Sequence, residues 1–358
     1  MTNKNPAGKA FYAVIYFTLA VALVLIIALF FVVLGDGEVD GDIIDTPNSD
    51  KVNDTDAVDV VLDNTPLFPT RETRTSYVIP QNENVKTIND SKVTSEHAIL
   101  VDLSSYTSIA EKRADEKIYP ASMTKVMTLI VACERITKLD EMLTVTDEIA
   151  LFAEKNDGSG IGLKVGESYT VEDLLFLISY QSDTIASLLI ADYIAGSEEA
   201  FVVLMNDKAK ELGLTSTSFA NCTGLYNDNN YTTCREMASI MAYALDNEMV
   251  FRCLSEYHGR PLTIGGVDCI AYSGWYSQRF NDKPVFNFKE NGKNISAKII
   301  AGKTGYTDES GYTLVSCAEI DGKRYVNVII TRTNKNSTVK VQEDPSAEQV
   351  KYIYKTYK

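Results

Sequence analysis

The stretch Tyr119-Pro120-Ala121-Ser122-Met123-Thr124-Lys125-Val126-Met127-Thr128-Leu129-Ile130-Val131-Ala132-Cys133 predicts a helix that the rest of the domain surrounds. Pro120 is favoured where a chain enters a helix, and Ser122 suits the cap or the first turn. The residues after Lys125 are apolar almost all the way round, which is typical of a helix buried on every side. Lys125 is the exception, because a lysine is rarely fully buried without a partner.

Ser122 and Lys125 together predict a nucleophile with its base. They are three residues apart, so on a helix their side chains share one face and can touch. A serine hydroxyl becomes a good nucleophile only when a nearby base takes its proton. A lysine can be that base when desolvation or a neighbouring cation lowers its pKa.

A simpler interpretation needs no chemistry: Ser122 only caps the helix and Lys125 extends to water. The chain also holds a second Ser-x-x-Lys, Ser337-Thr338-Val339-Lys340, in a polar stretch without helical periodicity. So short a pattern arises often by chance, and other parts of the chain must decide between the two interpretations.

Composition sets limits on the function. The chain has 358 residues, is 45% hydrophobic and carries a net charge of −15, so it can build a sizeable core. A nucleic-acid-binding surface needs clustered Lys and Arg, which this acidic balance disfavours. The histidines, His97 and His258, lie far apart, and no Cys-x-x-Cys or His-x-His occurs. We therefore expect no metal site and no cofactor.

The cysteines favour free thiols over disulfides. A chain of this length does not need a disulfide framework to be stable. The alternative is one bridge between Cys222 and Cys234, which flank a polar loop. The six cysteines are Cys133, Cys222, Cys234, Cys253, Cys269 and Cys317.

The N-terminal region predicts a membrane anchor. Residues 11–34 are an uninterrupted run of 24 residues without a charge, which is long enough to span a bilayer as a helix. Residues 1–10 carry Lys4 and Lys9, whereas acidic residues follow the run, so residues 1–10 are expected to be a cytoplasmic tail. A cleaved signal peptide is the alternative, but no clear small-x-small cleavage site follows.

The next segment predicts an acidic, disordered stalk over residues 35–93. Residues 36–63 contain ten acidic side chains and one basic one, Lys51. High net charge with few aromatic residues is typical of a disordered chain. The stalk leaves residues 94–358 as the folded domain, outside a single membrane anchor.

The folded part predicts an α/β domain. Residues 97–103 and 106–110 have the pattern of a hairpin, and residues 311–319 and 323–331 that of adjacent strands. Between them lie helical patterns, including residues 171–195, interrupted around 179–183. Strands occur at both ends of the domain and helices lie between them. This order favours a single sheet in which strands from the start and the end of the domain pair with each other.

Two further sites have suitable chemistry. Lys303-Thr304-Gly305 follows a predicted strand, where its lysine and hydroxyl can hold a carboxylate and its glycine lets the backbone approach a ligand. Ser182-Asp183-Thr184 lies in the helix interruption, where a hydroxyl can pass a proton to a leaving group.

With these motifs the chain resembles the penicillin-recognising serine enzymes, which carry Ser-x-x-Lys, Ser-x-Asn and Lys-Thr-Gly in that order. It is most similar to the serine D-alanyl-D-alanine carboxypeptidases, the low-molecular-mass penicillin-binding proteins. The similarity covers residues 95–358. It includes segments between the motifs, such as Thr223-Gly224-Leu225 and residues 191–206. It implies a β-lactamase/transpeptidase-like α/β fold, with a mainly antiparallel sheet flanked by helices and a helical subdomain.

The resemblance also implies a role for each site residue. Ser122 is the nucleophile, Lys125 its base, and Ser182 the relay to the leaving D-alanine. The substrate-binding residues are Thr184, Lys303, Thr304, Gly305 and Tyr306. Lys303 and Thr304 hold the terminal carboxylate, and the backbone N–H groups of Ser122 and Tyr306 form an oxyanion hole.

The implied reaction is removal of the terminal D-alanine from peptidoglycan stem peptides through an acyl-Ser122 intermediate. β-Lactam antibiotics acylate the same serine. The predicted anchor then implies a bacterial cell membrane protein whose catalytic domain is extracellular.

One departure from the family pattern keeps alternatives open. Thr184 stands where the family usually has asparagine, and a hydroxyl cannot replace both an amide donor and an amide acceptor. The alternative is therefore a degenerate wall-binding or penicillin-binding protein with little turnover. A class A β-lactamase is disfavoured because no Glu-x-x-Leu-Asn string occurs. A glutaminase or esterase on this fold has no positive support.

Overall fold

The structure, a computed structural model, describes residues 66–70, 73–256, 258–274, 280, 283–331 and 346–358, all within one compact unit. Three of the predicted features lie outside these residues: the tail at 1–10, the membrane span at 11–34 and the second Ser-x-x-Lys motif at 337–340. Within the described ranges, no helix is long and apolar enough to cross a membrane.

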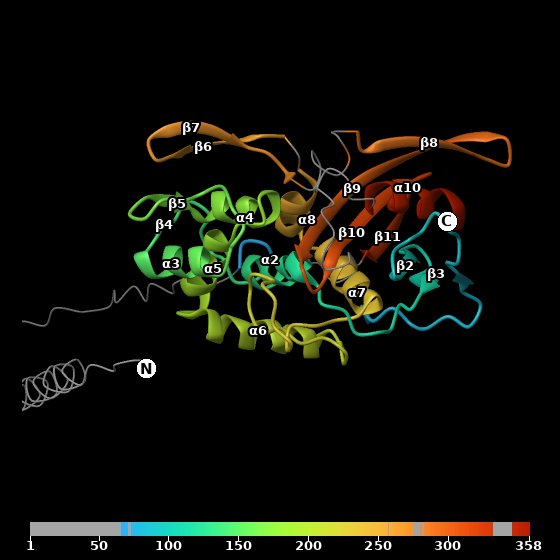
Figure 1. The fold of residues 1–358 in the computed structure, drawn as a ribbon, viewed down its shortest axis with the longest axis horizontal. Coiled ribbons are helices and arrows are strands. Elements are labelled where there is room, and N and C mark those ends of the chain that lie inside the picture. Colours follow the sequence, from blue (N-terminus) through green and yellow to red (C-terminus); the bar gives the residue numbers. More distant parts are fainter. Residues whose placement is uncertain (1–65, 71–72, 257, 275–279, 281–282, 332–345) are drawn as a thin grey trace, which may run out of the picture. The chain divides into compact units, whose positions relative to one another are not determined.

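A seven-stranded sheet forms one half of the unit (Figure 1). Its strand order is β1-β3-β2-β11-β10-β9-β8, and every pairing except that of β1 with β3 is antiparallel. The pairing of β2 with β11 joins the two ends of the domain, as the sequence predicts. The strands are β1 (Lys86–Thr87), β2 (His97–Asp102), β3 (Thr107–Lys112), β8 (Val285–Glu290), β9 (Lys293–Thr307), β10 (Gly311–Ile320) and β11 (Lys323–Thr331).

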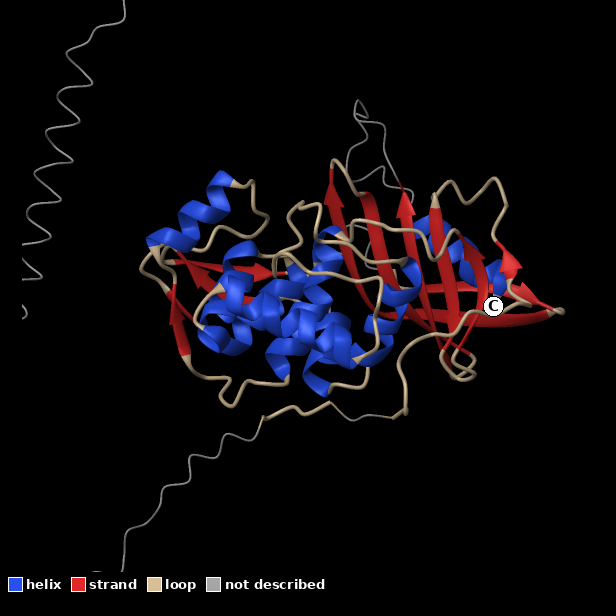
Figure 2. Cartoon of the chain, turned by 90° about the horizontal axis from the view of Figure 1, so that it is seen from below, coloured by secondary structure: helices blue, strands red, loops and turns tan. Residues whose placement is uncertain are grey.

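Most of the helices gather beside the sheet (Figure 2), and several of them surround α2. All nine residues of α2 are buried, because α4, α5, α6, α7 and α8 pack around it. The helices are η1 (Ala121–Thr124, a 3₁₀ turn), α2 (Lys125–Cys133), α3 (Asp147–Lys155), α4 (Val171–Tyr180), α5 (Thr184–Ala195), α6 (Glu198–Glu211), α7 (Cys234–Ala244), α8 (Glu248–Ser255) and α10 (Ser346–Tyr357).

The two faces of the sheet belong to different cores. Side chains alternate along a strand, so Val101 joins the core that contains α2 and α7, whereas Leu100 joins the core under α10. Both α7 and α10 pack on β2, β10 and β11. The central strands are therefore buried on both faces, which explains their nearly continuous apolar sequence.

Two small two-stranded antiparallel sheets complete the fold. β4 (Met142–Thr144) pairs with β5 (Ser168–Thr170), and β6 (Arg260–Ile264) pairs with β7 (Val267–Ala271). The predicted α/β architecture, with a mainly antiparallel sheet, flanking helices and a helical subdomain, is confirmed. All six cysteines are free thiols, so the alternative pair Cys222–Cys234 does not form.

The predicted stalk boundary at residue 93 is wrong. Residues 73–93 pack along the domain, where Tyr77, Ile79, Ile88 and Val93 are buried, and β1 adds a strand beside β3. Their polar neighbours hide this packing in the sequence, because only four side chains widely spaced along the segment enter the cores. The folded domain therefore begins before residue 94.

Candidate active site

The first pair of the site lies at the junction of η1 and α2. Pro120 caps η1, Ser122 lies within this turn, and Lys125 begins α2. Lys125 Nζ donates to Ser122 Oγ at 3.5 Å and also to the carbonyl oxygen of Thr223. Since Lys125 is only 1% exposed, the interpretation in which it extends to water is wrong. The predicted proximity of the two side chains is confirmed.

The surroundings of Lys125 favour its neutral form. Burial lowers the pKa of Lys125 to about 8, although the negative charges of Asp183 and Glu198 act in the opposite direction. A lysine with this pKa is partly deprotonated near neutral pH, so it can accept the proton of a nearby hydroxyl.

The second pair joins the helix interruption to β9. Ser182 lies between α4 and α5, in a left-handed conformation with φ of +55°. Lys303 Nζ donates to Ser182 Oγ at 3.1 Å and to the carbonyl oxygen of Thr304 at 2.8 Å. Lys303 is 1% exposed, so this pair is as deeply placed as the first.

Strand β9 brings the two pairs together. The η1 turn lies against β9 and β10, and Thr313 Oγ1 on β10 donates to the carbonyl oxygen of Pro120 at 3.1 Å. Gly305, two residues after Lys303, faces the backbone nitrogen of Ser122. Gly224 packs on the other side of this turn, against Ala121, with φ of +77°. Two glycines therefore let three segments of backbone meet at Ser122.

Gly305→Ala is expected to reduce acylation of Ser122 by about 100-fold, since it displaces the turn. A Cβ at Gly305 would lie 2.6 Å from the Ser122 nitrogen, 2.7 Å from Thr313 Oγ1 and 2.9 Å from Ala121 Cβ. The rate of labelling by a fluorescent penicillin measures the effect.

Gly166→Ala is the matched control. A Cβ there meets no atom within 4 Å, although the φ of +82° makes the substitution mildly strained. We expect this variant to lose about 1 kcal/mol of stability and to label normally. Normal labelling of Gly305→Ala would show that the close approach at Ser122 has no role.

The remaining predicted residues are placed differently from one another. Thr184 is the first residue of α5 and 1% exposed; its N–H donates to the carbonyl oxygen of Ser159 at 2.8 Å. Its side chain packs against Gly158. Thr304 is half-buried, and Tyr306 is 44% exposed beside Tyr312.

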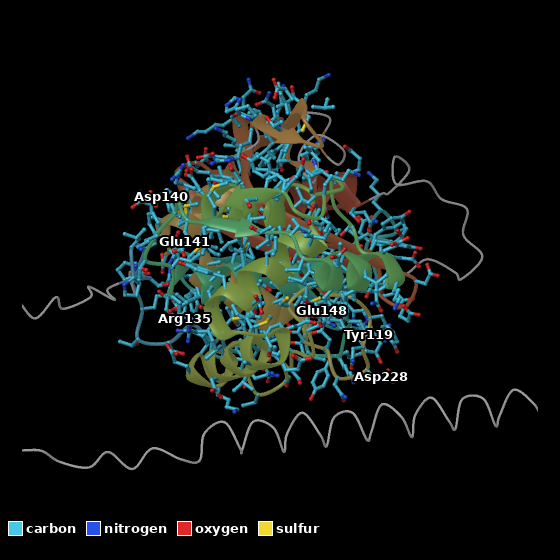
Figure 3. The ribbon with its side chains drawn as sticks, turned by 90° about the vertical axis from the view of Figure 1, so that its left-hand side faces the viewer. Tyr119, Arg135, Asp140, Glu141, Glu148 and Asp228 are labelled. Carbon is cyan, nitrogen blue, oxygen red and sulfur yellow. The ribbon has the colours of Figure 1, made fainter. Side chains whose placement is uncertain are left out.

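An aromatic cluster includes Tyr119, which directly precedes Pro120 at the start of the η1 turn. The rings of Tyr119 and Tyr226 meet edge to face at 5.1 Å, and both hydroxyls donate to Asp228 Oδ1. Figure 3 shows Tyr119 and Asp228 side by side. Lys117 completes this cluster by donating to the carbonyl oxygen of Asp228 at 3.2 Å.

The sequence interpretation missed two contributors to the site. Thr223 acts through its backbone carbonyl oxygen, which no residue pattern reveals. Asp183 is a buried carboxylate beside Ser182, and its position in Ser-x-Asn is unspecified in the family pattern. The glycine in Thr223-Gly224-Leu225 was the one available signal for the first.

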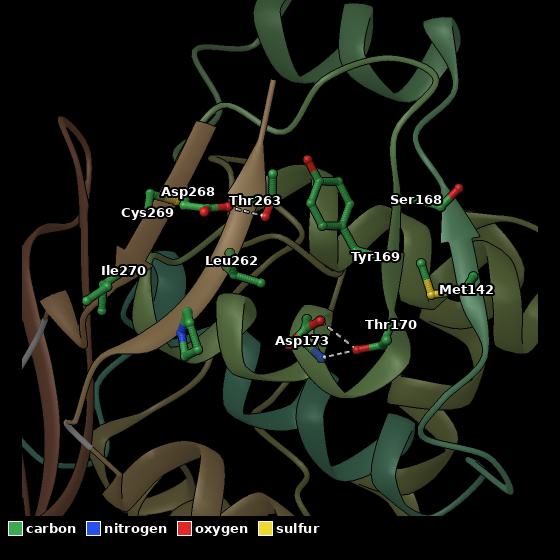
Figure 4. A pocket seen from close by; sticks show the side chains of 11 residues that line it. Met142, Ser168, Tyr169, Thr170, Asp173, Leu262, Thr263, Asp268, Cys269 and Ile270 are labelled. Atoms are coloured by element: carbon green, nitrogen blue, oxygen red, sulfur yellow. Dashed lines mark hydrogen bonds between the residues drawn. The ribbon is translucent and has the colours of Figure 1, made fainter. Parts of the chain in front are cut away.

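A separate groove of about 690 Å³ contains none of the predicted site residues (Figure 4). It lies between β4–β5 and β6–β7, where Thr263 bonds Asp268 and Thr170 bonds Asp173. Within the described part of the chain, no three His, Cys, Asp or Glu side chains are grouped to hold a metal ion.

The sequence matches the family described as D-alanyl-D-alanine carboxypeptidase, Peptidase_S11, over residues 84–334. It is 32% identical over 250 residues to D-alanyl-D-alanine carboxypeptidase DacF of Bacillus subtilis, covering 67% of this chain and 59% of that protein. It is 31% identical over 254 residues to DacC of Escherichia coli, covering 68% and 58%. The chain thus spans less than two-thirds of these relatives' length.

Solved structures agree on the fold. A mutant of the Streptomyces K15 DD-transpeptidase matches with a TM-score of 0.60 and 22% identity, over 73% of this chain and 98% of that one. A D-alanyl-D-alanine carboxypeptidase from Mycobacterium tuberculosis matches with a TM-score of 0.61 and 23% identity, over 77% and 96%. The family match, together with the motifs that meet around Ser122, shows that this chain belongs to the Peptidase_S11 family of D-alanyl-D-alanine carboxypeptidases.

Proposed function

We propose that this protein is a serine-type D-alanyl-D-alanine carboxypeptidase that removes the terminal D-alanine from peptidoglycan stem peptides. The observation that carries the proposal is a buried lysine, Lys125, within 3.5 Å of Ser122 Oγ and with a lowered pKa. The activity in the relatives' names supports the same assignment.

The first half-reaction acylates Ser122. Its Oγ attacks the carbonyl carbon of the penultimate D-alanine while Lys125 Nζ takes the hydroxyl proton. The N–H groups of Ser122 and Tyr306 stabilise the negative charge on the attacked oxygen, and losing one such donor costs ~2.7–4 kcal/mol. The C–N bond then breaks, and the leaving amine receives a proton through Ser182.

The second half-reaction is hydrolysis of the acyl-Ser122 ester by water. Before acylation, Lys303, which bonds Ser182 at 3.1 Å, supplies the positive charge that attracts the carboxylate of the terminal D-alanine, the group that later leaves, and Thr304 adds a hydroxyl. β-Lactams enter by the same route, because attack by Ser122 on their strained amide forms an equivalent ester.

We further propose that the protein works at the outer face of a bacterial cell membrane. The uncharged run 11–34 and the acidic residues after it support an anchor with its N-terminus in the cytoplasm. Protease treatment of intact cells tests this: the domain from residue 66 onward should be cleaved or released while residues 1–10 remain protected.

Thr184 supports a second candidate, a penicillin-binding protein with little turnover. It packs against Gly158 and brings no amide group to the site. Release of D-alanine from a D-Ala-D-Ala peptide, after covalent penicillin labelling is established, separates the candidates. Release over many turnovers favours the carboxypeptidase, whereas labelling without release favours the binder, and absence of labelling would contradict both.

A further inference from the structure

We propose that Asp183 is a positioning residue of this site, which holds Ser182 toward Lys303 and keeps a negative charge near Lys125. The inference rests on the proposed function. The pattern Ser-x-Asn leaves the middle position unspecified, so the family resemblance assigns no role to Asp183. Its contacts in this chain supply one.

Asp183 ties a loop to the N-terminus of α5. Its side chain caps this helix, because Oδ1 accepts from the N–H of Ala186 at 2.9 Å. Oδ2 accepts from the N–H of Ile161 at 3.0 Å, in the loop before β5. Gly160 of this loop packs so closely on the carboxylate that a Cβ there would clash with it. The Asp183 side chain is only 1% exposed, so these backbone N–H groups take the place of water as its hydrogen-bond donors.

The same loop also makes hydrogen bonds with Ser182 and Thr184, the residues on either side of Asp183. Ser159 Oγ donates to the carbonyl oxygen of Ser182 at 2.6 Å, and the N–H of Thr184 donates to the carbonyl oxygen of Ser159 at 2.8 Å. Ser182 has a φ of +55°, a left-handed conformation that is energetically costly for a serine. The contacts of Asp183 and Ser159 compensate this cost and keep Ser182 Oγ bonded to Lys303 Nζ.

The charge of Asp183 also acts on Lys125. Both of its oxygens accept backbone N–H groups, which suits an ionised carboxylate. Burial raises the pKa of Asp183, but the two N–H groups and the charge of Lys125 oppose this rise.

Several elements place titratable groups around Lys125. Asp183 comes from the start of α5 and Glu198 from the start of α6, and both carboxylates favour the charged form of Lys125. Cys222 comes from the loop before α7, and burial raises the pKa of its thiol, so it stays neutral. Lys303 approaches the same site from β9 through Ser182. Removing Asp183's charge should therefore lower the pKa of Lys125.

The pH dependence of penicillin labelling tests this inference with Asp183→Asn. We expect the midpoint of the rising limb to move about one unit to lower pH, because a neutral neighbour lets Lys125 lose its proton sooner. We also expect the plateau rate to fall about 10-fold, since Ser182 is less firmly held. Asp183→Ser, whose hydroxyl can still cap α5, should show the same shift and covers a failure of the amide variant to fold.

Two matched variants separate charge from position. Ser159→Ala removes a contact to Ser182 without changing a charge, so we expect a lower plateau and an unmoved midpoint. Asp173→Asn removes a carboxylate from the first turn of α4, where it bonds Arg260 at 2.7 Å, and should leave the midpoint unmoved.

An unmoved midpoint in both Asp183 variants, or an equal shift in Asp173→Asn, would overturn the inference while the proposed function stood. A wild-type protein that takes no penicillin label would instead remove the proposed function, and this inference with it.

Discussion

Ser122→Ala is expected to abolish covalent labelling by a fluorescent penicillin, with a loss of at least about 10⁴-fold in rate. The variant lacks the oxygen that we propose forms the ester, and Lys125 cannot replace it because Lys125 is buried and bonded to the carbonyl oxygen of Thr223. Labelling followed by gel electrophoresis and intact-mass measurement checks the result.

The fold of Ser122→Ala should remain intact. Ser122 lies in a 3₁₀ turn whose cap residue, Pro120, makes no side-chain hydrogen bond, and its hydrogen bond with Lys125 is long, at 3.5 Å. Losing one weak hydrogen bond costs about 1 kcal/mol or less, so the unfolding transition should move little.

Ser337→Ala is the matched control, because Ser337 begins the other Ser-x-x-Lys of the chain. We expect it to label at the wild-type rate. Labelling that survived in Ser122→Ala and disappeared in Ser337→Ala would reverse the assignment of the nucleophile.

The sequence predicted the elements whose pattern is local. The apolar run after Lys125 predicted a buried helix, and α2 is buried at all nine positions. The interruption around residues 179–183 predicted two helices, which are α4 and α5. Both predictions depended on periodicity and capping residues within a dozen positions, where sequence carries most of its information.

Contacts between segments that are distant in the sequence were harder to predict from the sequence. Residues 73–93 look like a polar linker, yet Ile79 N–H donates to Ser239 Oγ in α7 at 3.1 Å and Tyr77 packs on Tyr243. No local pattern predicts such partners, because a few apolar residues become buried only once the rest of the domain is present.

The candidate site shows the same division. The motifs predicted Ser122, Lys125, Ser182 and Lys303 from side-chain chemistry. The roles of Gly224 and Gly305 in letting backbones meet at Ser122 depend on three-dimensional approach. The carboxylate of Asp183 was hidden because its partners are backbone N–H groups, which every residue supplies.

Removal of the lysine tests the proposed base. Two variants remove the amine: Lys125→Ala, and Lys125→Met, whose unbranched side chain fills more of the space of the lysine. Each should slow acylation by about 10²–10⁴-fold, the usual contribution of general base catalysis. In the wild-type protein the rate should rise with pH and level off above about 8, as Lys125 loses its proton. Both variants should lose this limb, which stopped-flow labelling across pH 6–10 can follow.

The pH dependence of the folding stability provides an independent check that Lys125 is buried with a lowered pKa. The direction in which stability changes with pH decides the outcome. The pKa of Lys125 is about 8 in the folded state and near its ordinary 10.5 when unfolded, so burying the protonated form destabilises the fold below pH 8. This cost, about 3 kcal/mol at most, disappears as the pH rises from 8 to 10.5. Lys125→Met should therefore be more stable than wild type at pH 7, by denaturant unfolding, with a difference that shrinks toward pH 10.5. A Lys125→Met protein that gained stability in this way and still labelled at the wild-type rate would show that the lysine is buried as proposed but is not the base.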